Sequence, residues 1–269
     1  MSPADKRAAF RALHRQGCFA IPNPWDVGSA IALQGLGFKA LASTSSGMAW
    51  SRGMADNHVS RDVVLAHLSE LAAAVDLPLN ADFEGGFAVD PQDVEANVAL
   101  AVETGIAGLS IEDSTGDAAA PLHDFPLAVE RIAAARAAID ASGADVLLTG
   151  RSEGFIVGRP DMAQTLRRLA AYSEAGADCL YAPGVRTEAE VAEVVRAVAP
   201  KPVNVLAPGL SVASLAGLGV RRISVGGALA RAAWGEFLRA AREIAETGEF
   251  SALGRAARGG ELNAMFAAR

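Results

Sequence analysis

Charged side chains follow several apolar runs of this sequence, at the point where each run ends. Asp82 closes the run Leu77–Asp82, Glu112 closes Gly108–Glu112, and Arg151 closes Asp145–Arg151. Because the carboxyl ends of parallel strands meet at one mouth of a barrel, we expect these side chains to lie close together. Carboxylate oxygens suit Mg²⁺, with Mn²⁺ as the alternative, and a guanidinium suits a substrate carboxylate.

Further polar residues lie near these positions. Asn80 is a third candidate metal ligand, and Glu84 is a nearby acid. The segment Ser45–Met48 is either an ordinary polar turn or a nest of backbone N–H groups for an anion. Any one of the carboxylates could equally be a helix N-cap, and Arg151 could simply pair with Glu153, but the coincidence of several favours a functional site.

The histidines offer one candidate for proton transfer. His14 and His67 lie in predicted helices and are expected to be packing or surface residues, whereas His58 and His123 lie in loops. We consider only His123 as a proton donor. It lies in the loop 113–124, which could act as a lid over the site.

Short apolar runs alternate with longer amphipathic runs, as a parallel sheet with crossover helices requires. The predicted strands are Cys18–Pro22, Lys39–Ser43, Leu77–Asp82, Gly108–Glu112, Asp145–Arg151, Asp178–Ala182, Pro202–Leu206 and Arg222–Val225. The predicted helices are Gly28–Gln34, Arg61–Ala74, Pro91–Thr104, Pro126–Ala141, Asp161–Glu174, Glu188–Ala199, Val212–Gly217 and Leu229–Glu246. Eight strand–helix pairs predict an α/β fold, a (β/α)8 TIM-type barrel with extra C-terminal helices.

Composition favours one domain over residues 1–269, with 229–269 as a helical extension whose apolar side chains could cover a partner subunit. The chain is 51% hydrophobic, and 31 acidic against 24 basic residues give a net charge of −7. This balance argues against nucleic acid or an anionic membrane as partner. Cys18 and Cys179 are expected to be core thiols. No segment resembles a signal peptide or reaches transmembrane length, so we expect a cytoplasmic protein.

Five segments together carry a family resemblance. They are PNPWDVGSA, GFKALASTSSGMAW, NADFEGGF, GIAGLSIEDSTGD and LLTGRSEGF. In this order, over Phe19 to Ser224, the sequence resembles the isocitrate lyase/phosphoenolpyruvate mutase superfamily. The resemblance implies a Mg²⁺-dependent barrel, a homo-oligomer (dimer or tetramer), that makes or breaks a C–C or P–C bond of an α-oxo acid.

The resemblance also implies roles for individual residues. It places Ser46, Gly47 and Met48, with Ser45 beside them, on the superfamily's carboxylate-binding stretch. The metal-shell acids fall on Asp82 and Glu112, the catalytic Asp on Asp56, the substrate arginine on Arg151 and a substrate-contacting Asn on Asn204.

The departures from the superfamily pattern narrow the chemistry. Asn80 stands where the first metal Asp is expected, which removes one negative charge that Glu84 could restore. The loop that begins at Asp113 has no Cys, which argues against isocitrate cleavage by the lyase mechanism. Neither Lys nor Asn occurs between Glu112 and His123, which makes a phosphonate substrate less favoured.

The sequence therefore predicts a carbon–carbon lyase of small α-oxo or 2-hydroxy diacids. The expected reaction is Mg²⁺-dependent C–C cleavage through a metal-stabilised enolate, of the oxaloacetate decarboxylase or aldol-type lyase kind. One alternative is a non-catalytic protein that binds an α-oxo acid such as 2-oxoglutarate or pyruvate. Another is phosphonopyruvate or phosphoenolpyruvate chemistry, as a hydrolase or mutase.

Overall fold

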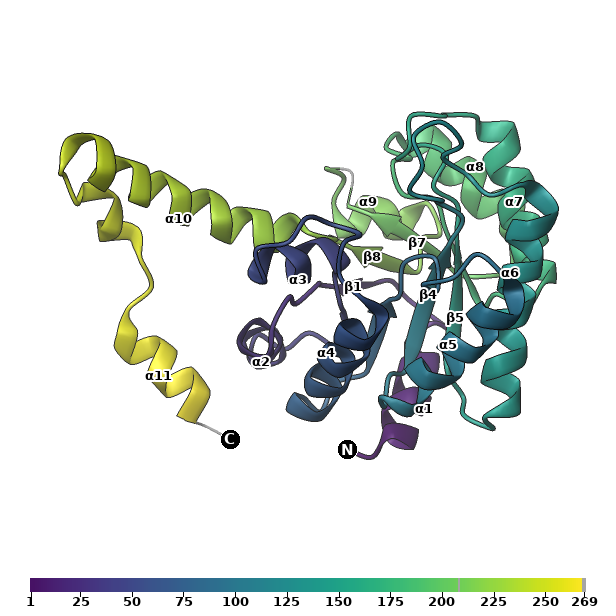
Figure 1. Ribbon diagram of the computed structural model, residues 1–269, viewed down its shortest axis with the longest axis horizontal. Helices are drawn as coiled ribbons and strands as arrows, with labels where there is room; N and C mark the ends of the chain where they lie inside the picture. The colour runs from purple at the N-terminus through teal and green to yellow at the C-terminus, as the bar shows by residue number, and fades with distance from the viewer. Residues whose placement is uncertain (208, 268–269) are drawn as a thin grey trace.

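Eight parallel strands form one curved sheet in the computed structural model, which describes residues 1–207 and 209–267 (Figure 1). The strands are β1 (Phe19–Ile21), β2 (Leu41–Ala42), β3 (Leu79–Asp82), β4 (Gly108–Glu112), β5 (Leu147–Arg151), β6 (Cys179–Tyr181), β7 (Val203–Leu206) and β8 (Arg222–Ser224). They pair in the order β1-β8-β7-β6-β5-β4-β3-β2. The amide of Ala42 donates to the carbonyl of Pro22 at 3.1 Å, which links β2 to the end of β1. The predicted (β/α)8 barrel is confirmed.

Helices follow the strands and cover the outside of this barrel. They are α2 (Val27–Gly35), α4 (Arg61–Ala74), α5 (Pro91–Glu103), α6 (Phe125–Ala141), α7 (Met162–Glu174), α8 (Glu188–Val198) and α9 (Val212–Gly217). Their inward-facing apolar side chains and the outward-facing ones of the strands form the main buried core, of which Leu68, Val98, Ile132, Leu169 and Val191 are members. The core thus holds the strand ends in fixed positions.

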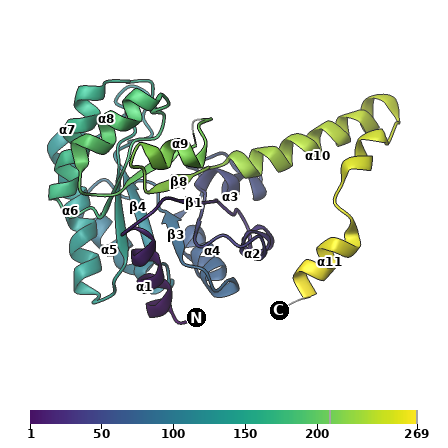
Figure 2. The ribbon, with the colours of Figure 1, turned by 180° about the vertical axis from the view of Figure 1, so that it is seen from behind.

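The amino-terminal end of the barrel is closed by helix α1 (Pro3–Leu13) (Figure 2). Its residue Phe10 is fully buried in a second apolar cluster with Ile21, Leu147 and Cys179. A side chain on Gly108 would meet the Phe10 ring at 2.7 Å, so this glycine makes room for the plug. The opposite end, where the strands finish, is left open for chemistry.

A short helix, α3 (Ser45–Ser51), starts three residues after β2 ends, where the sequence suggested a turn or a nest. The Thr44 hydroxyl caps it by accepting a hydrogen bond from the Gly47 amide at 3.3 Å. A Cβ atom on Gly47 would lie 2.9 Å from Cβ of Trp25 and 2.7 Å from Cγ2 of Thr44, so only glycine allows this close approach. The N-terminus of α3 therefore lies against the barrel mouth.

The last part of the chain leaves the barrel. Helix α10 (Ala228–Thr247) extends away from it, and η1 (Ser251–Arg255) and α11 (Gly259–Ala267) turn back, as Figures 1 and 2 show. Only Ala230 of α10 is buried. Among the helices of the described residues, none combines the length and apolar character needed to cross a bilayer.

Candidate active site

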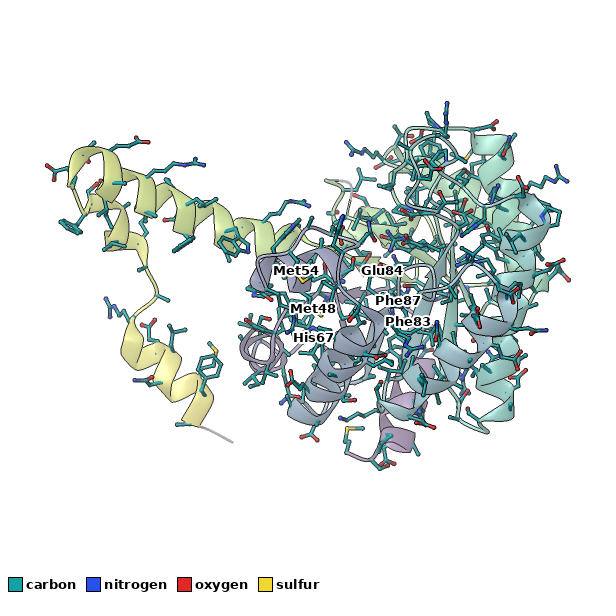
Figure 3. All side chains as sticks on the ribbon, in the orientation of Figure 1. Met48, Met54, His67, Phe83, Glu84 and Phe87 are labelled. Carbon is teal, nitrogen blue, oxygen red and sulfur yellow. The ribbon has the colours of Figure 1, made fainter. Side chains whose placement is uncertain are left out.

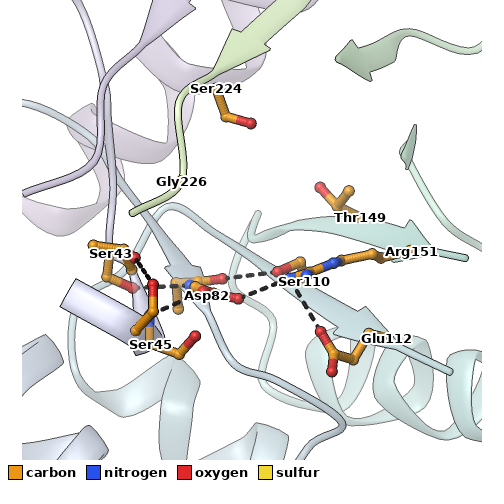
Figure 4. Close-up of polar contacts among 12 residues, drawn as sticks. Ser43, Ser45, Asp82, Ser110, Glu112, Thr149, Arg151, Ser224 and Gly226 are labelled. Carbon is orange, nitrogen blue, oxygen red and sulfur yellow. Dashed lines mark hydrogen bonds and ion pairs between the residues drawn. The ribbon is translucent and has the colours of Figure 1, made fainter. Parts of the chain in front are cut away.

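The structure brings Arg151, Asp82 and Glu112 together at the carboxyl ends of neighbouring strands (Figure 4). Nη1 of Arg151 lies 3.1 Å from Oδ1 of Asp82 and 3.0 Å from Oε2 of Glu112. Its Nε lies 2.5 Å from Oε1 of Glu153, which is almost fully buried. The Tyr181 ring lies 5.4 Å from the guanidinium carbon. Carboxylates and an aromatic face therefore fix the orientation of Arg151.

Carboxyl groups outnumber cationic groups at this mouth. Burial raises the pKa of Glu112 well above its ordinary value, and burial also raises the pKa of Glu153. Burial alone would lower the pKa of Arg151, but the acids around it, Glu112 first, raise that pKa well above its usual range. One guanidinium thus faces several carboxyl groups, which leaves room for a further cation.

Two more acids add to the excess. Burial, with the charges of Asp82 and Asp56, raises the pKa of Glu84 to about 8. Burial, with the charge of Asp82, raises the pKa of Asp56. Figure 3 shows Glu84 close to Phe83 and Phe87 in the segment after β3. The φ of Glu84 is 48°, in the left-handed region. This conformation costs a non-glycine residue roughly 1–3 kcal/mol and is common at functional sites.

The chemistry of this donor set fits Mg²⁺. Asp82 and Glu112 already converge on one cationic atom, Nη1 of Arg151. No group of three or more His, Cys, Asp or Glu side chains within the described ranges has the geometry of a metal site. A two-carboxylate site is nevertheless usual for Mg²⁺, which keeps several waters and takes other ligands from the substrate. Asp82 and Glu112 are therefore the residues that would hold it.

The residues predicted to bind the substrate carboxylate divide into two groups. Ser45 and Ser46 line a cavity of about 160 Å³ at the barrel mouth, with Asp56 and Arg151. The Ser45 amide donates to Oδ2 of Asp82 at 2.9 Å, which joins α3 to the acid cluster. Gly47 and Met48 are buried and do not line the cavity.

Asn80 and Asn204 also line the cavity, at its inner end. Oδ1 of Asn80 accepts a hydrogen bond from Nη1 of Arg222 at 3.2 Å. Oδ1 of Asn204 accepts a hydrogen bond from Nε of the same arginine at 2.9 Å. The structure therefore places Asn80 with Arg222, two residues before Asp82 and so one inward-facing position deeper, and the role of Asn80 as a metal ligand stays a prediction. Sequence analysis missed Arg222, although an arginine at an inward-facing strand position was a usable signal.

His123 is not brought into this cavity. It lies in a neighbouring one of about 530 Å³, which Glu84, Glu112 and Arg131 also line. Its Nε2 lies 2.6 Å from Nη1 of Arg131. Because arginine can only donate, Nε2 is the acceptor and has no proton to give. Burial and the Arg131 charge lower the pKa of His123, so its predicted role as proton donor gains no support.

The comparisons with known proteins agree on one family. The family model described as phosphoenolpyruvate phosphomutase matches residues 10–245. The Mycobacterium tuberculosis protein Rv1998c, which is uncharacterised, is 34% identical over 221 residues, 81% of both chains. A Burkholderia cenocepacia J2315 structure, provisionally described as a lyase/mutase, is 50% identical with a TM-score of 0.95 and covers 99% of this chain and 97% of its own.

A second similar solved structure is a complex with ligands. It is phosphonopyruvate hydrolase in complex with oxalate and Mg²⁺, 25% identical to this chain, with a TM-score of 0.86 and coverage of 99% of this chain and 95% of its own. The matched range of the family model includes all eight strands and every acid of the mouth. This chain therefore belongs to the phosphoenolpyruvate phosphomutase family, within the phosphoenolpyruvate mutase/isocitrate lyase superfamily.

Proposed function

We propose that this protein is a Mg²⁺-dependent carbon–carbon lyase that cleaves a small α-oxo or 2-hydroxy diacid, in an oxaloacetate-type decarboxylation or a related lyase reaction. The observation that carries the proposal is the contact of Asp82 and Glu112 with Nη1 of Arg151, beside a small polar cavity that Arg151 and Asp82 line. A cavity of about 160 Å³ suits a small substrate. A related hydrolase that binds oxalate and Mg²⁺ supports the same substrate class.

The chain's own residues supply binding and orientation. Arg151 offers its guanidinium to a substrate carboxylate, and Glu153 and Tyr181 hold that guanidinium in place. Mg²⁺, when bound by Asp82 and Glu112, would supply a Lewis acid for the oxygens of the oxo acid. In decarboxylation the bond to the departing carboxyl carbon breaks, carbon dioxide leaves, and the electron pair moves toward the 2-oxo oxygen. The carbon that lost the carboxyl group then takes up a proton from water, which gives the 2-oxo acid product.

Asp56 is suited to the proton transfer that a 2-hydroxy acid would require. Its raised pKa brings its carboxylate closer to accepting the hydroxyl proton when the carbon–carbon bond breaks. Ser45 and Ser46 line the same wall of the cavity and offer hydroxyl groups to substrate oxygens. These roles require no Cys in the loop 113–124, where the sequence has none.

Phosphonate chemistry is the second candidate, because the matching family model carries a phosphomutase description and the 25% identical hydrolase acts on phosphonopyruvate. The loop between Glu112 and His123 contains neither Lys nor Asn to manage a phosphoryl group, so we rank it second. Release of inorganic phosphate from phosphonopyruvate, faster than cleavage of any diacid, would reverse this ranking.

The deciding experiment follows pyruvate and carbon dioxide formation from oxaloacetate, with the spontaneous metal-catalysed rate subtracted. We expect turnover with Mg²⁺, none above background with EDTA, and a loss of about 100-fold or more in Arg151→Met. Arg196→Met, on the exposed face of α8, is the matched control and should keep full activity. Equal rates in Arg151→Met and the wild type would reject the proposed site, and a wild-type rate no higher than free Mg²⁺ would reject this substrate.

A further inference from the structure

The barrel interior beneath the acid cluster is polar. TIM barrels usually fill this space with layers of branched apolar side chains. Among the described residues, the lowest part of the interior is apolar, where Phe10, Ile21 and Leu147 pack. The layer above it contains the buried side chains of Asn80, Ser110, Thr149, Asn204, Arg222 and Ser224. A polar layer within a barrel is costly to bury and calls for an explanation.

The centre of this layer is the Arg222 guanidinium, on a residue that is 3% exposed. Nε donates to Oδ1 of Asn204 at 2.9 Å, Nη1 to Oδ1 of Asn80 at 3.2 Å and Nη2 to Oγ1 of Thr149 at 3.1 Å. All three acceptors are neutral. Within the described part of the chain, no carboxylate lies within 4.0 Å of the Arg222 nitrogens.

A buried charge without a counter-charge destabilises a fold by several kcal/mol, so proteins pair nearly all of them. Arg222 is instead surrounded by groups that are themselves held in place. Nδ2 of Asn204 donates to Oγ of Ser224 at 3.0 Å, and Nδ2 of Asn80 donates to the Ala81 carbonyl at 3.1 Å, which turns both amide oxygens toward Arg222. The guanidinium is therefore oriented in advance while its charge stays uncompensated.

Arg222 also has N–H groups without a partner among the described residues, and it lines a cavity. A guanidinium has five N–H groups. Three of them have partners, which leaves one on each terminal nitrogen without a partner among the described residues. Arg222 lines the 160 Å³ cavity together with Arg151. Its hydrogen-bond partner Thr149 is two residues before Arg151 on β5, so Arg222 is held one inward-facing position below Arg151, which is roughly 6.6 Å between the Cα atoms of Thr149 and Arg151.

We propose that Arg222 binds the second carboxylate of the substrate, so that the cavity selects short-chain dicarboxylates over monocarboxylates. One carboxylate then meets Arg151 at the mouth, and the other meets Arg222 at the inner end. The anion would supply the missing counter-charge and take up the two free N–H groups in charge-assisted hydrogen bonds. This inference rests on the proposed function only in taking a small α-oxo acid as the ligand.

The test is equilibrium binding rather than turnover. Isothermal titration compares 2-oxoglutarate with 2-oxovalerate, which share a five-carbon oxo-acid chain and differ in the distal carboxylate. Both are titrated with excess Mg²⁺, and neither is a β-keto acid, so neither is decarboxylated during the titration. For the wild type we expect the diacid to bind at least about 10-fold more tightly than the monoacid. In Arg222→Met this preference should disappear, while binding of the monoacid changes little.

Asn80→Asp is the second variant, because it keeps Arg222 and gives it an internal counter-charge. We expect Asn80→Asp to reduce the diacid preference, while its melting temperature stays equal to or above that of the wild type. If the role of Arg222 were purely structural, the diacid preference would not change. Mg²⁺ effects on the shared oxo-acid end cancel in the ratio of the two affinities. If Arg222→Met does not fold, Asn80→Asp alone decides.

A wild-type ratio near one, or an unchanged ratio in either folded variant, overturns the assignment of Arg222. The outcome is separate from that of the proposed reaction. If oxaloacetate is not cleaved but the ratio behaves as expected, only the reaction fails. If oxaloacetate is cleaved and Arg222→Met keeps the diacid preference, only the role of Arg222 fails.

Discussion

At the scale of single residues, the two arginines that line the cavity differ in their surroundings. Arg151 is paired with Asp82, Glu112 and Glu153, whereas the partners of Arg222 are neutral amides and a hydroxyl. The cavity is therefore acidic at its mouth and cationic at its inner end. Such polarity orients a ligand, because a cation is favoured at one end and an anion at the other.

The acidic end gives the first prediction, which concerns the metal. Asp82→Asn and Glu112→Gln each replace a carboxylate by a neutral amide at the candidate metal site, where both carboxylates contact Nη1 of Arg151. We expect each change to weaken divalent-cation binding by about 10-fold or more, since even outer-shell changes cost about 10- to 100-fold in metal sites. Mn²⁺ titration followed by electron paramagnetic resonance measures the affinity directly and does not depend on turnover.

Asp93→Asn, an exposed acid on α5, is the matched control for the loss of one charge and should bind Mn²⁺ as the wild type does. Addition of EDTA should abolish the signal of bound metal in every variant. Unchanged affinity in both Asp82→Asn and Glu112→Gln would mean that the cation is held elsewhere.

At the scale of elements, helix α4 contains a titratable group in its buried face. His67 is 4% exposed, and its Nε2 has no hydrogen-bond partner among the described residues. Burial, with the charge of Arg52, lowers its pKa from 6.5 to about 4, although Glu70 and Asp26 act in the opposite direction. Figure 3 shows His67 on α4, below the site.

The second prediction follows from the sign of this shift. Between about pH 6.5 and pH 4 the unfolded chain takes up a proton at His67 that the folded chain does not, so stability is present above this window and lost as the pH falls through it. His67→Leu should remove up to about 3 kcal/mol of this loss, at about 1.4 kcal/mol per pKa unit. Urea unfolding at pH 7, 5.5 and 4 measures it, with exposed His58→Gln as the control. Parallel pH curves for the wild type and His67→Leu would contradict the buried-histidine explanation.

Much of this architecture was predictable at the scale of elements. All eight strands and the positions of Asp82, Glu112 and Arg151 at strand ends followed from alternating apolar runs, because the carboxyl ends of parallel strands share one mouth. Helix α3 was missed because its N-cap Thr44 and its first residues, Ser45 and Ser46, also suit a turn. The strand pattern alone did not reveal α3, whose N-terminus the Thr44 hydroxyl caps.

Other features depend on contacts between residues of different elements. His123 and Arg131 are in neighbouring elements, and only their distance of 2.6 Å shows that Nε2 is occupied. Arg222 reads as an ordinary strand residue until the register sets it beside Asn204 and its hydrogen bond joins it to Asn80. The composition of a strand does not state which neighbours its inward side chains will meet, so an uncompensated buried charge is visible only in three dimensions.

At the scale of the whole molecule, the arm formed by α10, η1 and α11 is the least self-contained part. Phe237 is 59% exposed and Phe250 is 62% exposed, although both are large and apolar. The Phe237 ring packs edge-on against Trp234 at 5.5 Å, and both line a hollow of about 240 Å³ with Trp25 of the barrel. Phe266 of α11 reaches back to within 3.8 Å of a Cβ placed on Gly28. Because most helical stability in proteins comes from packing, a long helix with one buried residue is stabilised little by contacts with its own chain.

The third prediction is that this arm packs against a second copy of the chain in a homo-oligomer, as the family resemblance implies. Apolar side chains on one side of α10 would be covered by the same surface of a partner, which closed two-fold symmetry permits. We expect the wild type to sediment as a dimer or tetramer at micromolar concentration, and Phe237→Glu to shift it to the monomer while the barrel stays folded. Arg242→Glu adds at least as much negative charge to an exposed position of the same helix and should leave the oligomer intact. The prediction is contradicted by a wild-type monomer in analytical ultracentrifugation. It is also contradicted if Phe237→Glu and Arg242→Glu dissociate the oligomer equally.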